Sequence, residues 1–446
     1  MRRAAAFALV ATVALLAPVI GVLVAVPFAL IAVAGRAVSE GRIFELFARP
    51  SDRRAGELRG LVGFALAATG LALLMGLVNQ PTDPTVPNAP TVFVATLLVL
   101  GYGNLAEQTA CAYDDTPINR AVSFVAGGTV ATVAGIATVT AIVTAIPDPA
   151  VGDPMVPRST AVFLGLSGSV AGALVRAISF GRDDQLALLS IAAAIGALVS
   201  LDLQVEPVRL AVAVGIAGSV GYLSWRLETA SITGMLAGVL LSLATIVLGG
   251  YGWFAVLIAF FGIGGLASKY RYEEKRRMGV AEDNEGARGS RNVLGNAGVA
   301  LFAVVAFAAA ESAAVETVFQ FVFLGSLSTA MSDTLSSEIG VLFGPPRLIT
   351  TLEPVETGTD GGVTLKGIGI GAGGGAVVAL IAAATFGTGA VAAALIVAAG
   401  VLGMLVDSIL GATVEDRWIG NQAVNFLATL AGGVIAAAGA VAFALA

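Results

Sequence analysis

Apolar runs long enough to cross a bilayer recur along the whole chain. Each covers about 20 residues, the helical length that spans a ~30 Å hydrocarbon core. The Ala-, Leu-, Val- and Gly-rich runs are too continuous for barrel strands, so backbone polar groups would have to be satisfied within helices. Only 12% of the 446 residues are charged, too few to cover a soluble surface of this size. We therefore expect an all-α, polytopic transmembrane helical bundle.

The number of spans depends on the first apolar run. It forms either two spans, near residues 4–17 and 20–34, or one long tilted helix, which makes the total 15 or 14. That run is too long for a cleavable signal peptide, and no clear cleavage site follows it. The remaining expected spans lie near residues 60–79, 91–110, 121–145, 159–179, 185–201, 208–226, 230–248, 251–268, 293–311, 315–332, 367–385, 388–408 and 423–445.

Orientation follows from the distribution of Lys and Arg in short loops. Residues 36–59 and 269–291 are rich in both and should be cytoplasmic, with an even number of spans between them. Segments 80–90 and 146–157 contain Pro and Asp but no Lys or Arg, and suit the outside. We expect a multi-pass cell-membrane protein whose N-terminus is cytoplasmic. The polar loops at 333–366 and 409–422 would also face the cytoplasm.

The chain contains no histidine and a single cysteine, Cys111. Ser-His triads, His-ligated zinc and imidazole acid–base chemistry are therefore excluded, as are disulfides within the chain and Cys-rich metal sites. Chemistry must rely on carboxylates, hydroxyls, Lys, Arg and backbone amides.

We expect two parts of the chain, residues 1–184 and 185–446, and a weak internal repeat would relate them. Residues 59–63 resemble 291–295, and residues 172–176 resemble 403–407. Chance similarity among helices rich in small residues is the alternative. If the repeat is real, Thr109 and Arg176 occupy the positions of Asp333 and Asp407, and the first half is a scaffold without the catalytic acids.

The densest polar motif is S-D-T-L-S-S-E-I-G at 332–340, at the cytoplasmic end of an expected span. Helical spacing places Asp333 with Ser337 and Thr334 with Glu338, each pair four residues apart. Carboxylates there cannot face lipid and need partners such as cations. A polar helix end that frays into water is the alternative.

A second motif, T-G-T-D-G-G-V-T-L-K, occupies 357–366. Glycines beside Asp360 let backbone N–H groups converge on an anion while the carboxylate holds Mg²⁺. Lys366 could reach a phosphate oxygen, although the Walker A spacing is absent. A flexible glycine turn is the alternative interpretation.

The third motif, D-S-I-L-G-A-T at 407–413, ends another span. Asp407 closes an otherwise uncharged helix, and an ionisable residue there is a functional candidate. Gly403 and Gly411 suit close helix–helix approach. Simple termination of the span at the water interface would also explain the aspartate.

These motifs suit Mg²⁺–nucleotide chemistry, because phosphoryl transfer requires mainly positioning and charge neutralisation. The predicted catalytic acids are Asp333, Asp360 and Asp407, which would also hold Mg²⁺. The adjoining apolar bundle suggests a lipid-tailed acceptor. Predicted substrate- or phosphate-binding residues, drawn from the motifs and their flanks, are Arg291, Asn296, Ser332, Thr334, Ser337, Glu338, Arg347, Thr359, Gly361, Gly362, Lys366, Ser408 and Asn425.

From about residue 185 onward, the chain resembles a family of integral membrane proteins that includes the phytyl-phosphate kinase of tocopherol biosynthesis and is related to phytol and farnesol kinases. The matching stretches are 332–340, 345–367, 403–415 and 421–426, with Arg291 and Asn296 matching an upstream Arg…Asn pattern. Glu415 departs from the amide expected in many members. The resemblance implies transfer of a nucleotide γ-phosphate, with CTP favoured, to an isoprenoid monophosphate or isoprenol. It also implies that Asp333, Glu338, Asp360 and Asp407 are metal ligands or phosphate-site carboxylates.

Two other functions remain open at this stage. A secondary transporter would show repeated halves and ionisable residues near mid-membrane, whereas the acidic motifs here end helices on one face. A membrane cytidylyltransferase is the third possibility. The expected partners are the bilayer, an isoprenoid phosphate and a nucleotide, and no nucleic acid.

Overall fold

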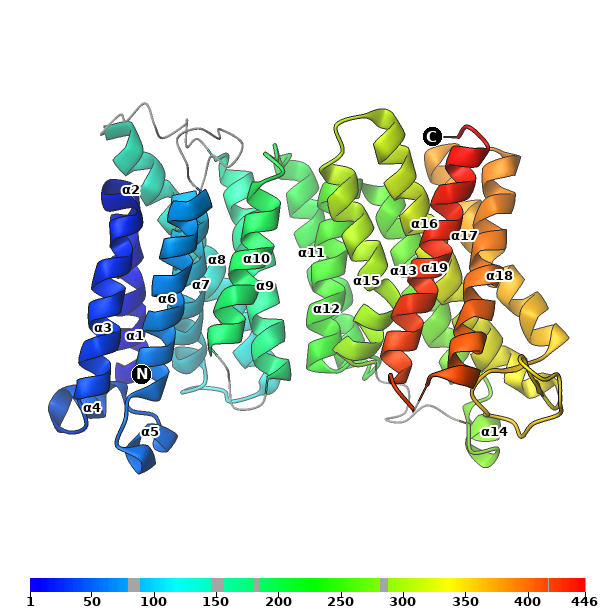
Figure 1. The fold of residues 1–446 in the computed structure, drawn as a ribbon, viewed down its shortest axis with the longest axis horizontal. Coiled ribbons are helices and arrows are strands. Elements are labelled where there is room, and N and C mark those ends of the chain that lie inside the picture. Colours follow the sequence, from blue (N-terminus) through cyan, green and yellow to red (C-terminus); the bar gives the residue numbers. More distant parts are fainter. Residues whose placement is uncertain (79–88, 146–155, 180–183, 281–287, 416, 446) are drawn as a thin grey trace. The chain divides into compact units, whose positions relative to one another are not determined.

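The chain folds into two helical units, Met1–Leu210 and Ala211–Ala446. The computed structural model describes residues 1–78, 89–145, 156–179, 184–280, 288–415 and 417–445. Within these residues, 13 helices are long and apolar enough to cross a membrane. The all-α polytopic bundle is therefore confirmed (Figure 1). This number is below the expected 14 or 15 for two reasons. The first apolar run, Arg2–Ala37, is a single candidate span, and the helix Gln185–Val199 is too short to be one.

The first unit begins with an apolar run that turns back on itself. Gly21, with a φ of +54°, interrupts the run. The chain then reverses direction, so that α4, the helix after α3, packs against α1 (Figure 1). The run is thus two antiparallel pieces. The helices of this unit are α1 (Arg2–Thr12), α2 (Ala17–Ile20), α3 (Ala25–Ala37), α4 (Gly41–Phe47), α5 (Pro50–Ala55), α6 (Arg59–Val78), α7 (Ala89–Ala110), α8 (Pro117–Ala145), α9 (Arg158–Ile178) and α10 (Asp184–Val199).

The second unit contains all three sequence motifs. Its helices are α11 (Pro207–Arg226), which begins at the unit boundary, α12 (Ile232–Ala244), α13 (Tyr251–Lys269), α14 (Tyr272–Arg277), α15 (Ser290–Ala308), α16 (Ala313–Leu335), α17 (Leu365–Phe386), α18 (Ala390–Thr413) and α19 (Asn421–Ala442). A π-helical turn, Ser336–Gly340, extends α16. Between α16 and α17, strands β1 (Arg347–Leu348) and β2 (Gly362–Val363) pair antiparallel.

Polar side chains start several of these helices. The hydroxyl of Ser231 accepts a hydrogen bond from the Gly234 N–H (3.2 Å), and Thr364 accepts one from Gly367 (2.9 Å). Both are N-cap bonds, which satisfy backbone donors that a helix leaves unpaired at its start. At the other end of α17, Gly387 adopts a left-handed φ of +69° and terminates the helix.

One central helix organises each unit. In the second unit, α16 packs against α15, α17, α18 and α19; in the first, α7 packs against α6, α8, α9 and α10. This shared neighbour pattern is what an internal repeat predicts. The helix α10 packs against α7 and α9 in the first unit, which extends to Leu210.

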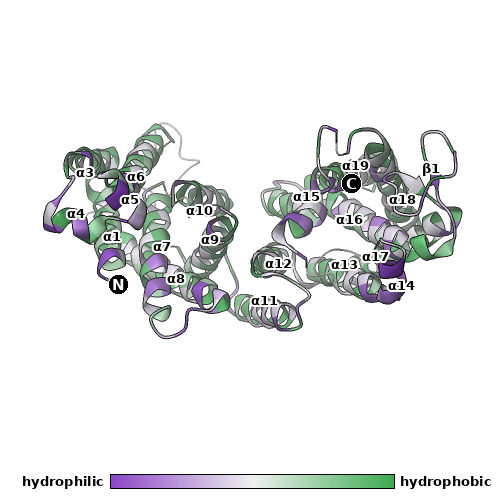
Figure 2. Cartoon of the chain, turned by 90° about the horizontal axis from the view of Figure 1, so that it is seen from below, coloured by the Kyte–Doolittle hydropathy of each residue, from purple (hydrophilic) through white to green (hydrophobic). Residues whose placement is uncertain are grey.

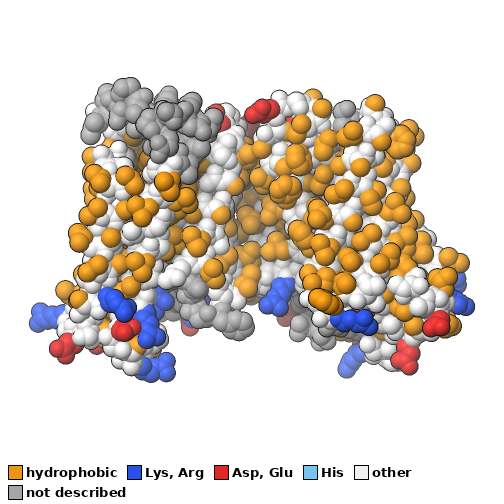
Figure 3. All heavy atoms as spheres, viewed as in Figure 1, with side chains coloured by type: hydrophobic (Ala, Val, Ile, Leu, Met, Phe, Trp, Pro, Cys, Tyr) orange, Lys and Arg blue, Asp and Glu red, His pale blue; other side chains and the backbone are white. Residues whose placement is uncertain are grey.

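In each unit, hydrophobic side chains cover the flanks of the helices (Figure 3). Lys and Arg gather at the end where α5 lies in the first unit and α14 in the second, and these short helices are the most hydrophilic (Figure 2). Such a distribution suits a bilayer around the flanks and a positively charged end in the cytoplasm. The segments predicted to be outside, 80–90 and 146–157, lie largely beyond the described residues.

Candidate active site

A cavity of about 290 Å³ opens at the end of the second unit, where α16 and α18 finish. It brings together residues from all three sequence motifs. Its lining includes the three predicted catalytic acids: Asp333, Asp360 and Asp407. Of the predicted binding residues, it also contains Asn296, Thr334, Ser337, Glu338, Thr359, Gly361, Gly362, Ser408 and Asn425.

Close contact between α16 and α18 positions two of the acids. The Thr329 hydroxyl donates to the Ala399 carbonyl (3.3 Å). A Cβ on Gly403 would come within 2.1 Å of that hydroxyl oxygen, so only glycine permits this approach. Asp333 lies one helical turn beyond Thr329, and Asp407 lies one turn beyond Gly403. The crossing therefore directs both carboxyl groups toward the same point.

The carboxyl groups of Asp333 and Asp407 are neighbours in this cavity, close enough for each to act on the charge of the other. Both residues are half-buried, and the Oδ1 atom of Asp407 is buried without a hydrogen-bond partner in the described residues. Two carboxylates at this distance repel each other unless a proton or a cation lies between them. Asp360 and Glu415 also lie near enough to act on the charge of Asp407.

The loop that carries Asp360 is pressed against α18. Gly361 adopts a left-handed φ of +76°, and a Cβ there would lie 2.6 Å from the Ser408 carbonyl oxygen. Its own carbonyl accepts a hydrogen bond from the Ile349 N–H (3.0 Å). The expected anion nest is only partly available, because the Gly362 N–H donates to the Thr359 carbonyl (2.9 Å) within the same turn.

Glu338 already has partners for both of its oxygens. Oε2 forms an ion pair with Lys275, and Oε1 accepts a hydrogen bond from Ser268 (3.0 Å). The Lys275 side chain is only 1% exposed and also donates to the Ser268 carbonyl (2.7 Å). Glu338 is thus engaged in a buried ion pair that joins α14 to the π-helical turn after α16. A role as metal ligand would require exchange of these partners.

Arg288, which the sequence motifs do not include, lines the cavity. The backbone N–H of Arg288 donates to the Thr229 carbonyl (3.0 Å), and its carbonyl accepts from the Ser231 N–H (3.1 Å). Its guanidinium group lies over the Phe260 ring, 5.7 Å from the centroid. A buried, fixed guanidinium beside three aspartates is well placed to bind phosphate oxygens.

Four predicted binding residues do not line this cavity. Ser332 is fully buried inside the bundle, whereas Arg291 is exposed on the first turn of α15. Arg347 donates to the Leu352 carbonyl (2.7 Å), within its own loop. Lys366 is exposed, with its ammonium group 5.5 Å from the centroid of the Phe343 ring.

The carboxylate oxygens of this cavity form only part of a binding site for a divalent cation. Among the described residues, no three Asp, Glu, Cys or His side chains converge into a metal-binding group. The Asp333–Asp407 pair, with one buried oxygen lacking a hydrogen-bond partner, offers carboxylates from two helices. Mg²⁺ commonly takes one or two protein carboxylates and completes its shell with water and substrate phosphate. The pair fits that mode, in which substrate supplies the remaining ligands.

Comparison with known proteins identifies the family. Residues 215–433 match the model of the family described as integral membrane protein DUF92. The uncharacterized membrane protein MJ0933 of Methanocaldococcus jannaschii is 36% identical over 42% of this chain and 75% of its own length. The chain belongs to this family.

Two further relatives match a similar share of the chain. The Synechocystis membrane protein sll0875 is 32% identical over 44% of this chain and 77% of its own length. Protein VTE6, chloroplastic, of Arabidopsis thaliana is 33% identical over 46% of this chain, but only 64% of its own length. No solved structure matches the chain. The DUF92 match contains all three motifs and the whole described lining of the cavity.

Arg288 and Lys275 are the site residues that sequence reasoning missed. Both lie in the basic stretch 269–291, which the distribution of charge assigned to membrane orientation. Asn292 and Asn421 also line the cavity. A usable signal existed for Asn292, since Asn292 and Asn296 are four residues apart and the side-chain amide of Asn296 donates to the Asn292 carbonyl (3.0 Å).

Proposed function

We propose that this DUF92 protein is a membrane kinase that transfers a phosphoryl group from a nucleoside triphosphate, with CTP favoured, to an isoprenoid monophosphate or isoprenol. The observation that carries the proposal is the pair of carboxyl groups of Asp333 and Asp407, which meet in a polar cavity lined by Arg288. The choice of acceptor and of CTP rests on the resemblance of the motifs to the phytyl-phosphate kinase family.

The proposed reaction needs few groups from the protein. An acceptor oxygen forms a bond to the γ-phosphorus, while the bond from that phosphorus to the β–γ bridging oxygen breaks and the nucleoside diphosphate leaves. A monophosphate acceptor attacks as an anion, so no proton has to be removed. With an alcohol acceptor, the hydroxyl proton would pass to a carboxylate of the Asp333–Asp407 pair.

We assign Asp333 and Asp407 to hold Mg²⁺, which when bound would neutralise charge on the transferring phosphates. Asp360, at the rim on a loop pressed against α18, would orient the nucleotide or a second ion. Arg288 would bind phosphate oxygens directly, and its fixed backbone would keep the guanidinium in place without a cost in ordering. The hydroxyls of Thr334 and Ser337 would donate to the same phosphates.

The test is phosphoryl transfer by the purified, full-length protein in lipid nanodiscs. γ-Labelled CTP or ATP would be supplied with prenyl alcohols and prenyl monophosphates, with and without Mg²⁺. We expect label in the prenyl product, dependent on Mg²⁺. Asp407→Asn should abolish the transfer, while Asp114→Asn, an exposed aspartate of the first unit, serves as the matched control. Absence of transfer for every donor and acceptor by folded protein would contradict the proposal and favour transport.

A further inference from the structure

A second cavity, of about 320 Å³, lies in the first unit, which the family match does not reach. Four arginines line it: Arg3 from α1, Arg49 and Arg54 from α5 and the residue before it, and Arg176 from α9. Its described lining contains no aspartate or glutamate. Four guanidinium groups around one concave space create a strongly positive potential, which favours an anionic ligand.

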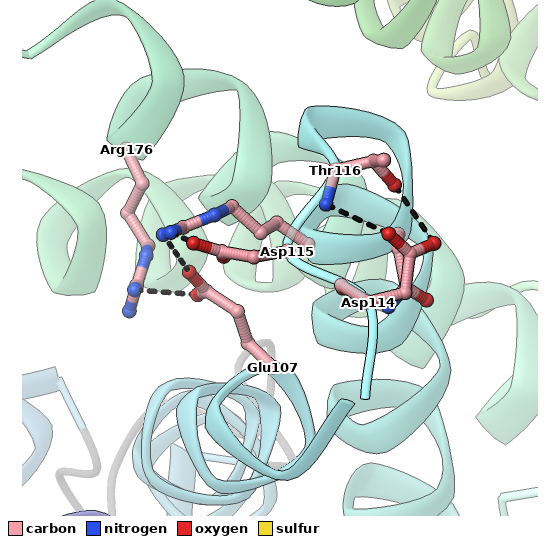
Figure 4. A network of polar contacts seen from close by, with 7 residues as sticks. Glu107, Asp114, Asp115, Thr116 and Arg176 are labelled. Atoms are coloured by element: carbon pink, nitrogen blue, oxygen red, sulfur yellow. Dashed lines mark hydrogen bonds and ion pairs between the residues drawn. The ribbon is translucent and has the colours of Figure 1, made fainter. Parts of the chain in front are cut away.

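Arg176 supplies the fixed wall of this cavity. It is 9% exposed, and its guanidinium donates to the Glu107 carboxylate (2.8 Å) and to the Asn104 side chain (3.3 Å). Figure 4 shows Arg176 directed at Glu107, which also pairs with Arg120 (3.7 Å). The guanidinium further lies 4.7 Å from the centroid of the Phe124 ring. Arg176 is therefore rigid, and one carboxylate is shared between two arginines.

Arg49 and Arg54 are placed by local structure. The Arg49 side chain lies across Gly60, where a Cβ would come within 2.6 Å of its Nε atom. The Arg49 backbone N–H donates to the buried carboxylate of Asp52 (3.0 Å), which fixes the start of α5. Arg54, in the last turn of this short helix, also lines the cavity. No described residue forms a hydrogen bond or ion pair with the Arg54 side chain.

The rule that places positive charge at the cytoplasmic side does not account for this convergence. Neighbouring arginines at the same end of the unit point elsewhere and pair with glutamates: Arg53 with Glu45 (2.9 Å) and Arg59 with Glu57 (3.1 Å). Both pairs are exposed, as expected for orientation signals. The four cavity arginines instead come from three separate parts of the chain.

The rest of the lining is apolar. Phe7, Phe64 and Leu100 line the same cavity, and the rings of Phe7 and Phe64 pack edge to face with centroids 6.1 Å apart. A ligand that satisfies both parts carries an anionic head for the arginines and an apolar portion for the aromatic side. Phosphate is the head that forked guanidinium groups bind best.

We propose that this cavity binds a phosphate group borne by a membrane amphiphile, at a site separate from the Asp333–Asp407 cavity. The same arginines could take a phosphate from two sources, a lipid headgroup or a phosphate dissolved in water. The apolar side of the cavity favours the lipid.

Binding is measured on full-length protein in nanodiscs of neutral phosphatidylcholine without Mg²⁺, using labelled dioctanoyl phosphatidic acid or inorganic phosphate. We expect saturable binding of phosphatidic acid that weakens as salt is raised. The Arg49→Gln/Arg54→Gln double variant should weaken it about tenfold or more. Arg53→Gln, which removes a charge from the same helix outside the cavity, is the matched control and should change affinity less than about twofold.

A second pair of variants tests the geometry without removing charge. Gly60→Ala places a methyl group where the Arg49 side chain lies, and should weaken binding by displacing it. Gly70→Ala on the same helix meets no atom within 4 Å and should bind like wild type. Thermal unfolding confirms that each variant is folded.

The two probes separate the sources. Binding of phosphatidic acid alone assigns the site to a lipid headgroup, and equal binding of inorganic phosphate assigns it to the phosphate group itself. Absence of binding of both probes to folded wild-type protein overturns the proposal. So does an equal loss of affinity in Arg53→Gln and the double variant, because the effect would then be one of general surface charge.

Discussion

The Lys275 ammonium group forms a buried ion pair with the Glu338 carboxylate and thereby ties α14 to the π-helical turn that follows α16. The same ammonium donates to the carbonyls of Ala267 (3.1 Å) and Ser268 (2.7 Å), at the end of α13. A side chain from a short helix thus joins the ends of two long ones. Because this turn borders the Asp333–Asp407 cavity, the ion pair holds the wall of the candidate site in place.

We predict that breaking this ion pair destabilises the protein. Lys275→Met leaves the Glu338 carboxylate buried without its cation, and should lower the free energy of unfolding by about 3–5 kcal/mol. The double variant Lys275→Met/Glu338→Gln should recover much of that loss, since no unpaired charge remains. Thermal unfolding in detergent measures the effect.

The control is the exposed pair on the same short helix. Arg276 and Glu273 are 3.8 Å apart and both about 70% exposed. Arg276→Met should change stability by under about 1 kcal/mol. Equal losses of unfolding free energy in Lys275→Met and Arg276→Met would mean that the buried pair contributes no more to stability than the exposed pair.

We predict that Arg288, and not Arg291, binds the nucleotide phosphates. Arg288 lines the cavity, whereas Arg291 is exposed at the start of α15. Arg288→Gln should lower kcat/KM for the nucleotide about a hundredfold, the effect of losing a charge-assisted phosphate contact. Arg291→Gln should remain within about threefold of wild type. Steady-state kinetics of both variants test this prediction. A larger loss of kcat/KM in Arg291→Gln than in Arg288→Gln would assign phosphate binding to Arg291 instead.

The orientation of the second unit is tested by cysteine accessibility in a Cys111→Ala background. Glu356→Cys, in the exposed loop before α17, should resist an impermeant thiol reagent in intact cells, because that loop is predicted to be cytoplasmic. Ser312 begins α16 at its other end and is exposed. Ser312→Cys should therefore react. Labelling of Glu356→Cys in intact cells would place the candidate site outside the cell.

Much of the site could be anticipated because its information is local. The first and third motifs end hydrophobic helices and the second precedes one, so the predicted topology places all three at helix ends on one face of the bundle. The i, i+4 spacing that links Thr329 to Asp333 and Gly403 to Asp407 can be read directly from the chain. Convergence of these motifs therefore follows from topology and helical geometry.

What could not be anticipated depends on contacts between distant residues. Lys275 and Glu338 are 63 residues apart, and no local pattern tells a buried lysine from the exposed basic residues beside it. Arg288 and Arg291 are only three residues apart, yet Arg288 precedes α15 and Arg291 lies in its first turn. The backbone hydrogen bonds of Arg288 to Thr229 and Ser231 fix its position at the cavity. The sequence leaves the first apolar run open between one span and two, and the contact between α1 and α4 decides for a return at Gly21.

We predict that Gly361 is required to keep the Asp360 loop against α18. A Cβ there would lie 2.6 Å from the Ser408 carbonyl oxygen and 2.5 Å from the Ala412 Cβ, in a left-handed conformation. Gly361→Ala should push the loop away and lower kcat at least tenfold while the bundle remains folded. Gly387→Ala has the same left-handed strain but open space around it, and so controls for backbone strain alone. Equal activity in the two variants would show that loop position is irrelevant.

The Asp333–Asp407 pair should separate activity from stability. Each Asp→Asn change keeps the shape of the side chain and removes one of two carboxyl groups in contact, so repulsion within the pair disappears. We expect Asp333→Asn and Asp407→Asn to unfold at the same temperature as wild type or higher. Both should nevertheless lose about a hundredfold or more in kcat, about 3 kcal/mol of transition-state stabilisation.

The double variant distinguishes a shared role from two independent ones. Because both carboxylates would serve the same ion and phosphate, Asp333→Asn/Asp407→Asn should be little worse than the poorer single variant. Mg²⁺ should raise the unfolding temperature of the wild type in the presence of nucleotide and have no such effect on the double variant. If the single variants lost stability together with activity, the pair would be a structural contact, and the unpaired oxygen of Asp407 would need another explanation.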